Sequence, residues 1–157
     1  MDKAMPNQPD PLASVCEFVV KGVKSLVENA RNRGYVAYES ERVYLRGYCV
    51  YPGVNFIHEP DGIIGLGAMF RLHQGDMDEV VRWPFQPRFK LRVVHPKGGE
   101  EREREGVVYI CAPPLQRPQE RRAQHSPWTA AGLNLESLIS GGYVENDQLR
   151  MKFELLP

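Results

Sequence analysis

The stretch from Leu149 to Leu155 alternates strictly between apolar and charged residues, and this pattern constrains the fold more than any other feature of the chain. The apolar members are separated by Arg150, Lys152 and Glu154. Successive side chains of a β-strand point to opposite faces, so a strand here has one apolar face and one charged face. Such a strand covers a core on one side and meets water on the other, which is typical of an antiparallel sheet.

Five further segments have the composition of strands. The segment from Phe89 to Val94 repeats the alternation of apolar and charged residues. The segments Arg42 to Tyr51 and Ile63 to His73 are longer and rich in β-branched and aromatic residues, which predicts central strands with both faces partly covered. The two shorter segments are Val107 to Cys111 and Glu17 to Lys21.

Proline and glycine residues separate these segments. They predict turns at Pro52-Gly53, Pro60-Asp61-Gly62, Pro96-Lys97-Gly98-Gly99 and Gly141-Gly142. The turn at Pro52-Gly53 is expected to end the strand that closes on Tyr51. Six or more strands at this spacing predict an all-β fold, an antiparallel β-sandwich.

Two segments have apolar residues at helical spacing. One runs from Leu135 to Ile139, with Asn134 as its cap and Gly141 as its end, and it predicts one short helix. The other runs from about Val23 to Asn32, where apolar residues recur at i, i+3, i+4 and i+7 and favour a second helix.

Length and charge exclude several classes of protein. A chain of 157 residues fits one domain, which we expect at residues 15–157 after a linker-like leader at residues 1–14 that is rich in proline. Twenty basic residues balance twenty acidic ones, so the net charge attracts neither nucleic acid nor anionic lipid. No apolar run approaches the roughly 20 residues of a membrane-spanning helix, so no membrane insertion is expected.

The three cysteines, Cys16, Cys49 and Cys111, are an odd number without the spacing of a zinc motif. We expect reduced thiols in a cytoplasmic or nuclear protein, with no metal and no cofactor. A hydrolase that uses a cysteine and a histidine is the enzymatic alternative. No spacing selects such a pair, and the sequence favours a protein without enzyme activity. The carboxylates Asp76 and Asp78 are better explained by a polar turn than by a metal site.

Four motifs follow one another in the second half of the chain. Gly75 to Phe85 has the pattern G-x-x-D-x-x-x-x-W-P-F, and Leu115 to Pro118 is similar to F-Q-R-P. Leu133 to Leu138 has the pattern of a short helix, and Tyr143 to Asp147 has the pattern aromatic-x-x-D-D. In this order and spacing they resemble the TRAF/MATH (meprin and TRAF-C homology) domain, above all the C-terminal domain of tumour necrosis factor receptor-associated factors. The resemblance extends over roughly Val15 to Leu156.

The resemblance implies an antiparallel β-sandwich of seven or eight strands with one short helix, and strand and loop at residues 22–33. Domains of this family bind short extended peptides of receptor tails or substrate proteins at a sheet edge. They act as adaptors in cytoplasmic signalling or ubiquitin-linked recruitment, and TRAF relatives form trimers, which makes a homo-oligomer one expectation for this chain. Tyr51 falls on an aromatic residue that contacts peptides in relatives; a core aromatic at a strand end is the other interpretation of Tyr51.

Several positions depart from the ligand-binding pattern of the family. The peptide-reading arginine corresponds to Cys49, whose side chain cannot pair with an acidic ligand residue. The serines that bind a ligand glutamine in some relatives correspond to Ala112, Pro113 and Pro114, and prolines lack even a backbone N–H group.

The segment around Ser126 resembles the family more closely. Ser126 matches a ligand-contacting serine, although the glycine that follows it in relatives is Pro127 here. Trp128 lies within one residue of aromatic positions that hold an apolar ligand residue. We therefore expect a more apolar ligand, held by Trp128, Tyr51 and Met69. A structural or self-assembly module with a vestigial groove is the alternative.

Overall fold

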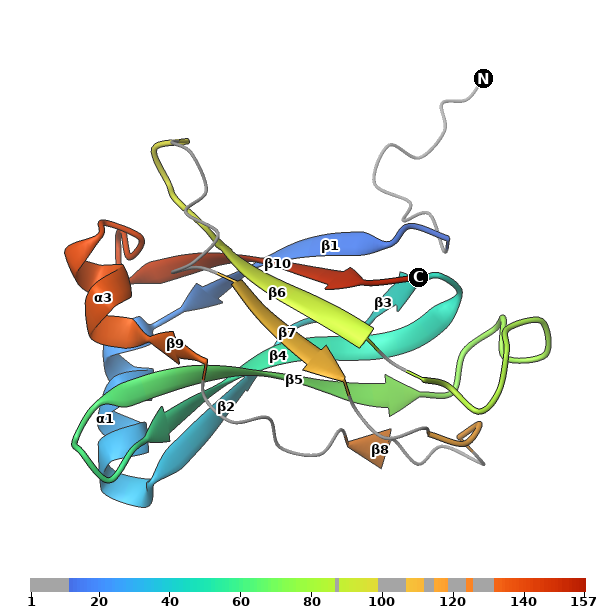
Figure 1. Ribbon diagram of the computed structural model, residues 1–157, viewed down its shortest axis with the longest axis horizontal. Coiled ribbons are helices and arrows are strands. Elements are labelled where there is room, and N and C mark those ends of the chain that lie inside the picture. The colour runs from blue at the N-terminus through green and yellow to red at the C-terminus, as the bar shows by residue number, and fades with distance from the viewer. Residues whose placement is uncertain (1–11, 87, 99–106, 112–114, 119–123, 126–131) are drawn as a thin grey trace.

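The computed structural model describes residues 12–86, 88–98, 107–111, 115–118, 124–125 and 132–157. In these residues ten strands form two antiparallel sheets that face each other, together with two helices (Figure 1). The predicted β-sandwich is confirmed. Seven strands have five residues or more, and the other three, β3, β8 and β9, have two or three residues.

The four-stranded sheet has the strand order β1-β10-β6-β7. Its strands are β1 (Val15–Lys21), β10 (Gln148–Leu155), β6 (Arg88–Val94) and β7 (Val107–Cys111). The four apolar residues of the alternating segment in β10 are buried, as predicted: Leu149, Met151, Phe153 and Leu155. The other face of this strand carries the charged side chains.

The six-stranded sheet has the order β2-β4-β5-β8, while β3 pairs with β4 and β9 pairs with β5. Its strands are β2 (Tyr35–Glu39), β3 (Val43–Leu45), β4 (Tyr48–His58), β5 (Ile64–His73), β8 (Gln124–His125) and β9 (Leu133–Asn134). Strands β4 and β5 are central, as their composition predicted. Strand β2 is an addition to the strands that the alternation pattern identified.

Aromatic contacts join the two sheets through the core. The ring of Phe89 on β6 lies 4.6 Å from that of Phe70 on β5 and 4.6 Å from that of Phe153 on β10, measured between centroids. All three side chains have no exposed surface. Aromatic pairs at such distances stabilise a core beyond the area that they bury. At the edge of the sandwich the Tyr38 hydroxyl of β2 donates a hydrogen bond of 2.9 Å to the Val19 carbonyl of β1.

The expected strand from Arg42 to Tyr51 is divided in two. Strand β3 ends at Leu45, and β4 begins at Tyr48 after a two-residue turn at Arg46-Gly47. Both turn residues have a positive φ, of 48° and 87°. Such two-residue turns match the twist of a hairpin, so this turn lets β3 and β4 pair directly.

The predicted turn at Pro52-Gly53 is wrong. Strand β4 runs through both residues to His58, and the connection to β5 lies at residues 59–63. At Gly53, β2 comes so near that an added Cβ would lie 2.5 Å from the Tyr38 carbonyl oxygen. The glycine therefore permits the close approach of two strands and forms no turn.

Helix α1 (Val23–Arg33) connects β1 to β2 and covers one end of the sandwich (Figure 1). The helical spacing predicted it, whereas the strand and loop that the family resemblance implied for this segment are wrong. Its first turn is capped from the far end of the chain. The Lys24 N–H group donates to Oδ1 of Asp147 at 2.8 Å, and the Val23 N–H group donates to the Asp147 carbonyl at 3.1 Å.

Helix α3 (Leu135–Ser140) is the predicted short helix. The Asn134 side chain accepts a hydrogen bond of 3.3 Å from the Ser137 N–H group, and Gly141 follows the last turn, as expected. Leu135 and Leu138 are buried against the core, which fixes this helix beside β9.

Replacing Gly53 by alanine is expected to lower the free energy of unfolding by about 3 kcal/mol, because the added methyl group meets the backbone of β2. Gly62→Ala is the control. A Cβ at Gly62 meets nothing within 4 Å, and its φ of 88° leaves only backbone strain, which costs about 1 kcal/mol. Urea unfolding of both variants measures the difference, and equal losses would contradict this role of Gly53.

Replacing Asp147 by alanine is expected to lower the free energy of unfolding by about 1 kcal/mol, because the first turn of α1 loses the carboxylate that caps it. Asp147→Asn keeps an acceptor oxygen and tolerates the φ of 61° at this position, so it should lose less than half as much. Thermal unfolding followed at a helix-sensitive wavelength compares the two. The prediction fails if asparagine is as harmful as alanine.

Candidate functional site

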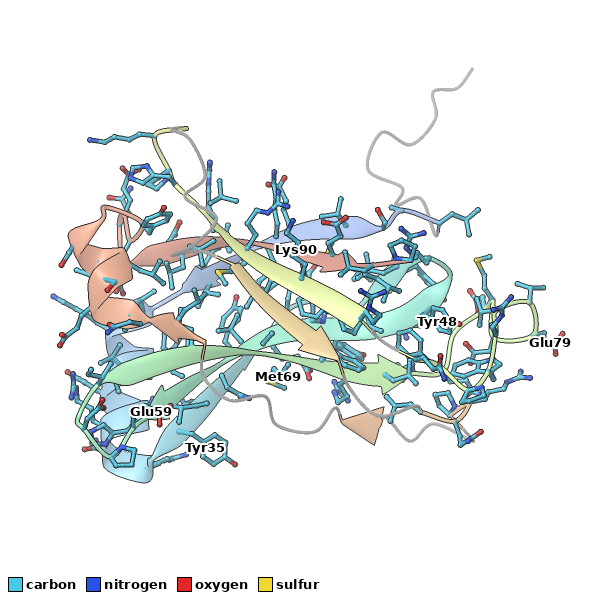
Figure 2. All side chains as sticks on the ribbon, viewed as in Figure 1. Tyr35, Tyr48, Glu59, Met69, Glu79 and Lys90 are labelled. Carbon is cyan, nitrogen blue, oxygen red and sulfur yellow. The ribbon has the colours of Figure 1, made fainter. Side chains whose placement is uncertain are left out.

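The outer face of the six-stranded sheet carries the candidate site. In the antiparallel register Tyr51 lies opposite Arg71, and Gly53 lies opposite Met69. The alternate residues of both strands, Val50, Val54, Phe70 and Leu72, are fully buried in the core. Tyr51, Met69 and Arg71 therefore face away from the core, and all three are half-buried. Figure 2 shows the side chains on the ribbon, with Met69 labelled on β5.

Arg71 is held by two neighbours on this face. Its Nε donates to Oε2 of Glu39 at 2.8 Å, and its Nη2 donates to Oε1 at 2.6 Å. The guanidinium carbon lies 4.0 Å from the centre of the Tyr51 ring. The hydrogen bonds to Glu39 raise the pKa of Arg71, with smaller contributions from Tyr51, so Arg71 carries its charge at every relevant pH.

Two strands supply this ion pair across a third. Glu39 is the last residue of β2 and is paired in register with Gly53 of β4. Because Gly53 has no side chain, Glu39 reaches over β4 to Arg71 of β5. A hydrogen bond of 2.8 Å from the Ser40 N–H group to the Pro52 carbonyl fixes the end of β2. We call Glu39, Tyr51, Met69 and Arg71 the outer-face cluster.

His73 extends this cluster along β5. Its ring lies 5.8 Å from the ring of Tyr51, with the planes at 79°. Its Nδ1 is 2.7 Å from the Gln74 carbonyl oxygen, so this nitrogen carries the proton. Tyr51 thus has two neighbours on β5, the guanidinium group of Arg71 and the imidazole ring of His73.

Cys49, the candidate that replaces the family's arginine, is fully buried. It pairs with His73 in register, but the segment after β5 folds over it. A Cβ added at Gly75 would lie 2.6 Å from Cβ of Cys49. Burial raises the pKa of the Cys49 thiol, and Arg42 offsets this in part. The Cys49 side chain therefore lies beneath the segment that follows β5 and reaches no surface.

The polar turn after β5 is confirmed and is held by the Asp78 carboxylate. The Gly75 N–H group donates to Oδ2 of Asp78 at 2.9 Å, and the Asp76 N–H group donates to the Tyr44 hydroxyl at 3.1 Å. The Trp83 indole donates to the Asp78 carbonyl at 2.7 Å. No cluster of three or more His, Cys, Asp or Glu side chains in the described part of the chain could hold a metal ion.

The W-P-F motif packs against the start of β4. The ring of Tyr48 stacks on Phe85 at 4.0 Å and meets Trp83 edge-on at 5.4 Å, between centroids. The Tyr48 hydroxyl donates to the Arg82 carbonyl. Burial raises the pKa of this hydroxyl. The motif that marks the family therefore anchors the loop after β5 and forms no part of the outer-face cluster.

Five of the predicted ligand-contacting residues lie outside the described residues: Ala112, Pro113, Ser126, Pro127 and Trp128. The backbone of β8 locates the segment that leads to them, since His125 pairs with Arg71 in register. Sequence reasoning missed Glu39 and Arg71. The period of two along Ile63 to His73 places Arg71 on the same face as Met69 and was the available signal.

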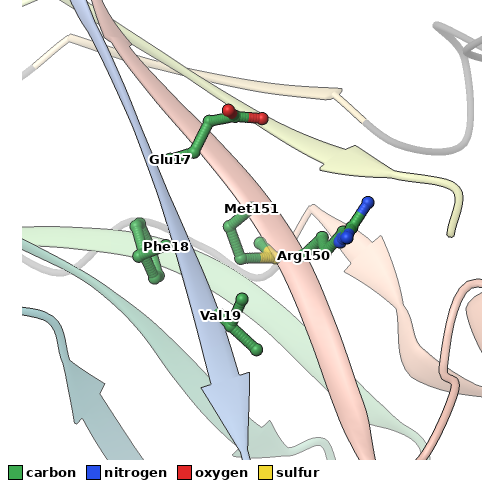
Figure 3. A pocket seen from close by; sticks show the side chains of 5 residues that line it. All are labelled: Glu17, Phe18, Val19, Arg150 and Met151. Carbon is green, nitrogen blue, oxygen red and sulfur yellow. The ribbon is translucent and has the colours of Figure 1, made fainter.

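A separate pocket of about 300 Å³ lies on the four-stranded sheet between β1 and β10 (Figure 3). Its lining residues are Glu17, Phe18, Val19, Arg150 and Met151. The lining contains one acidic, one basic and three apolar side chains. The outer-face cluster lies on the six-stranded sheet, so the pocket is not part of it. Neither described helix is long and apolar enough to cross a membrane.

Comparison with known proteins agrees with this architecture. The family model described as TRAF/meprin, MATH domain matches residues 39–152. TRAF5 of Notothenia coriiceps has a similar structure, with a TM-score of 0.66 and 17% sequence identity over 92% of this chain and 73% of that chain. A search of curated proteins finds no match. The chain belongs to the TRAF/meprin family of MATH domains, which are protein-interaction modules.

Proposed function

We propose that this domain binds a short extended segment of a partner protein on the outer face of the six-stranded sheet, beside β5 and β8. The observation that carries the proposal is the outer-face cluster, where the half-buried Tyr51 and Met69 present apolar surface next to a paired Arg71. Tyrosine and methionine are common at such recognition surfaces, because one supplies a rigid ring and the other adapts its shape.

The edge of the sheet suits an extended ligand. Beyond the ten-residue strand β5, the described residues form two strands of two residues each, β8 and β9. A peptide that adds its backbone near such an edge gains affinity from main-chain hydrogen bonds, and alternate side chains reach the surface beside it. Residues of the ligand spaced by two would then face Tyr51 and Met69.

The chemistry of the cluster favours an apolar ligand. Cys49 offers no charge and no exposed atom, and Arg71 already binds a carboxylate. Tyr51 and Met69 remain as contact surface, with Trp128 expected as a third contact. We place this recognition in cytoplasmic signalling or ubiquitin-linked recruitment, with receptor tails or substrate proteins as partners. The sequence motifs and the free cysteines Cys16 and Cys49 support that setting.

Both described thiols are poor candidates for catalysis. Burial raises the pKa of Cys16 from its ordinary value of 9.0 to about 11, and burial also raises the pKa of Cys49. The thiolate is the nucleophilic form, so these residues stay protonated and unreactive at neutral pH. This supports a binding function over a thiol hydrolase.

Alkylation of Cys16 should be slow in the folded domain. At pH 8 a thiol with a pKa of about 11 has about 100-fold less thiolate than one with a pKa of 9.0, which its greater nucleophilicity offsets in part. We expect labelling about tenfold slower than in the urea-unfolded chain, and a rate that rises as the pH approaches 11. Peptide mapping by mass spectrometry reads each cysteine separately. Fast labelling of folded Cys16 at pH 7 would contradict the protonated thiol.

Peptide binding should depend on the outer-face cluster. The best-binding peptide is first selected from a random library. Tyr51→Ala and Met69→Ala are each expected to lower the affinity for this peptide about tenfold or more, because apolar contact is lost. Tyr35→Ala is the matched control, because Tyr35 is an exposed tyrosine at the other end of the same sheet. Titration calorimetry with the wild type and the three variants measures the affinities.

The outcomes of this screen separate the alternatives. Weaker peptide binding by the Tyr51 and Met69 variants, with unchanged binding by the Tyr35 variant, supports peptide recognition at this face. A library that enriches no peptide, or equal affinity in all four proteins, would contradict peptide recognition at this face.

A further inference from the structure

We propose that Glu39 is a specificity-determining residue that excludes acidic side chains from the ligand position facing Arg71. The inference rests on the proposed function and adds to it the residue that selects the ligand class. The ligand at this position is then apolar or aromatic. Glu39 and Tyr51 together occupy one edge and one face of the Arg71 guanidinium group.

Arg71 is the cation of the outer-face cluster, and its best anion-binding edge is filled. The two parallel hydrogen bonds from Nε and Nη2 to Glu39 are 2.8 Å and 2.6 Å long. This bidentate arrangement is the geometry in which arginine binds a carboxylate most strongly. One face of the guanidinium plane also lies against the Tyr51 ring at 4.0 Å. A ligand carboxylate that approaches Arg71 therefore finds one edge of the guanidinium group bonded to Glu39 and one face covered by Tyr51.

The charge of the pair acts in the same direction. Glu39 and Arg71 together are neutral, so the cluster has no net attraction for an anion. A second carboxylate beside Arg71 would also lie near the carboxylate of Glu39, and like charges at such distances repel each other. An apolar or aromatic residue meets no such repulsion and can pack on Tyr51 and Met69.

Glu39 is positioned before any ligand arrives. The end of β2 is held by the hydrogen bond from Ser40 to Pro52, and Gly53 leaves room for the Glu39 side chain to cross β4. Because the pair is preorganised, a ligand carboxylate would have to displace a carboxylate that is held at little entropic cost. The backbone of β2 thus sets the charge preference of a site formed by β4 and β5.

The test is a change of ligand class. A random peptide library is selected on the wild type and on Glu39→Gln, which keeps the length of the side chain and removes its charge. We expect the wild type to enrich apolar or aromatic residues. We expect Glu39→Gln to enrich Asp or Glu at one position and to bind those peptides about tenfold tighter than the wild type does, about 1.4 kcal/mol.

Two further variants assign the effect. Glu41→Gln removes an exposed glutamate that lies outside β2 and should select the same peptides as the wild type. In the double variant Glu39→Gln/Arg71→Gln the preference for acidic peptides should disappear, because the guanidinium group that would bind the acidic residue has been removed. The ion pair is partly exposed and contributes little to stability, so all variants should fold, which equal thermal unfolding temperatures would show.

The failures of the two proposals differ in their results. If the wild type enriches apolar peptides and Glu39→Gln enriches the same peptides, Glu39 does not set the specificity, although the domain still binds peptides at this face. A wild type that enriches acidic peptides overturns this inference together with the proposed apolar ligand class, whereas peptide binding at this face would stand. If the wild type enriches no peptide, the proposed function itself fails, and this inference fails with it.

Discussion

The antiparallel pairing of β4 with β5 is the constraint on which the rest of the structure depends. It runs without a break from Cys49 opposite His73 to His58 opposite Ile64. Because side chains alternate, this one register puts Val50 and Leu72 into the core and Tyr51 and Arg71 on the outer face. A slip of one residue would exchange the two faces, so the core and the candidate site are fixed by the same pairing.

Strict alternation made most of the sandwich predictable. Strands β10 and β6 follow directly from it, and α3 follows from apolar spacing with Asn134 and Gly141 at its ends. The local sequence pattern predicted a turn at Pro52-Gly53, and this was wrong because a tertiary contact determines the backbone conformation there. Proline and glycine usually end a strand, but the close approach of β2 at Gly53 gives β4 a partner through these residues. The helical period of α1 was a better guide than the resemblance to relatives.

The candidate site could be predicted in part. The part that could not be predicted consists of contacts between residues far apart in the sequence. The sequence predicts Tyr51 and Met69 as ligand contacts, and both lie on the outer face. The ion pair between Glu39 and Arg71 joins residues that are 32 positions apart and lie on different strands. It depends on two registers at once, β2 with β4 and β4 with β5, and no local pattern contains both. The burial of Cys49 likewise depends on Gly75, which the fold brings over it.

The residues that mark the family and those that would select the ligand are different in this chain. Asp78 holds the turn over Cys49, Trp83 anchors to the Asp78 carbonyl, and Asp147 caps α1. Each of these contacts stabilises a loop or a helix end that the sandwich requires. Glu39 and Arg71 stabilise little, because their pair is partly exposed. A surface pair of this kind can change without loss of the fold, so ligand preference can diverge among domains that keep the same framework.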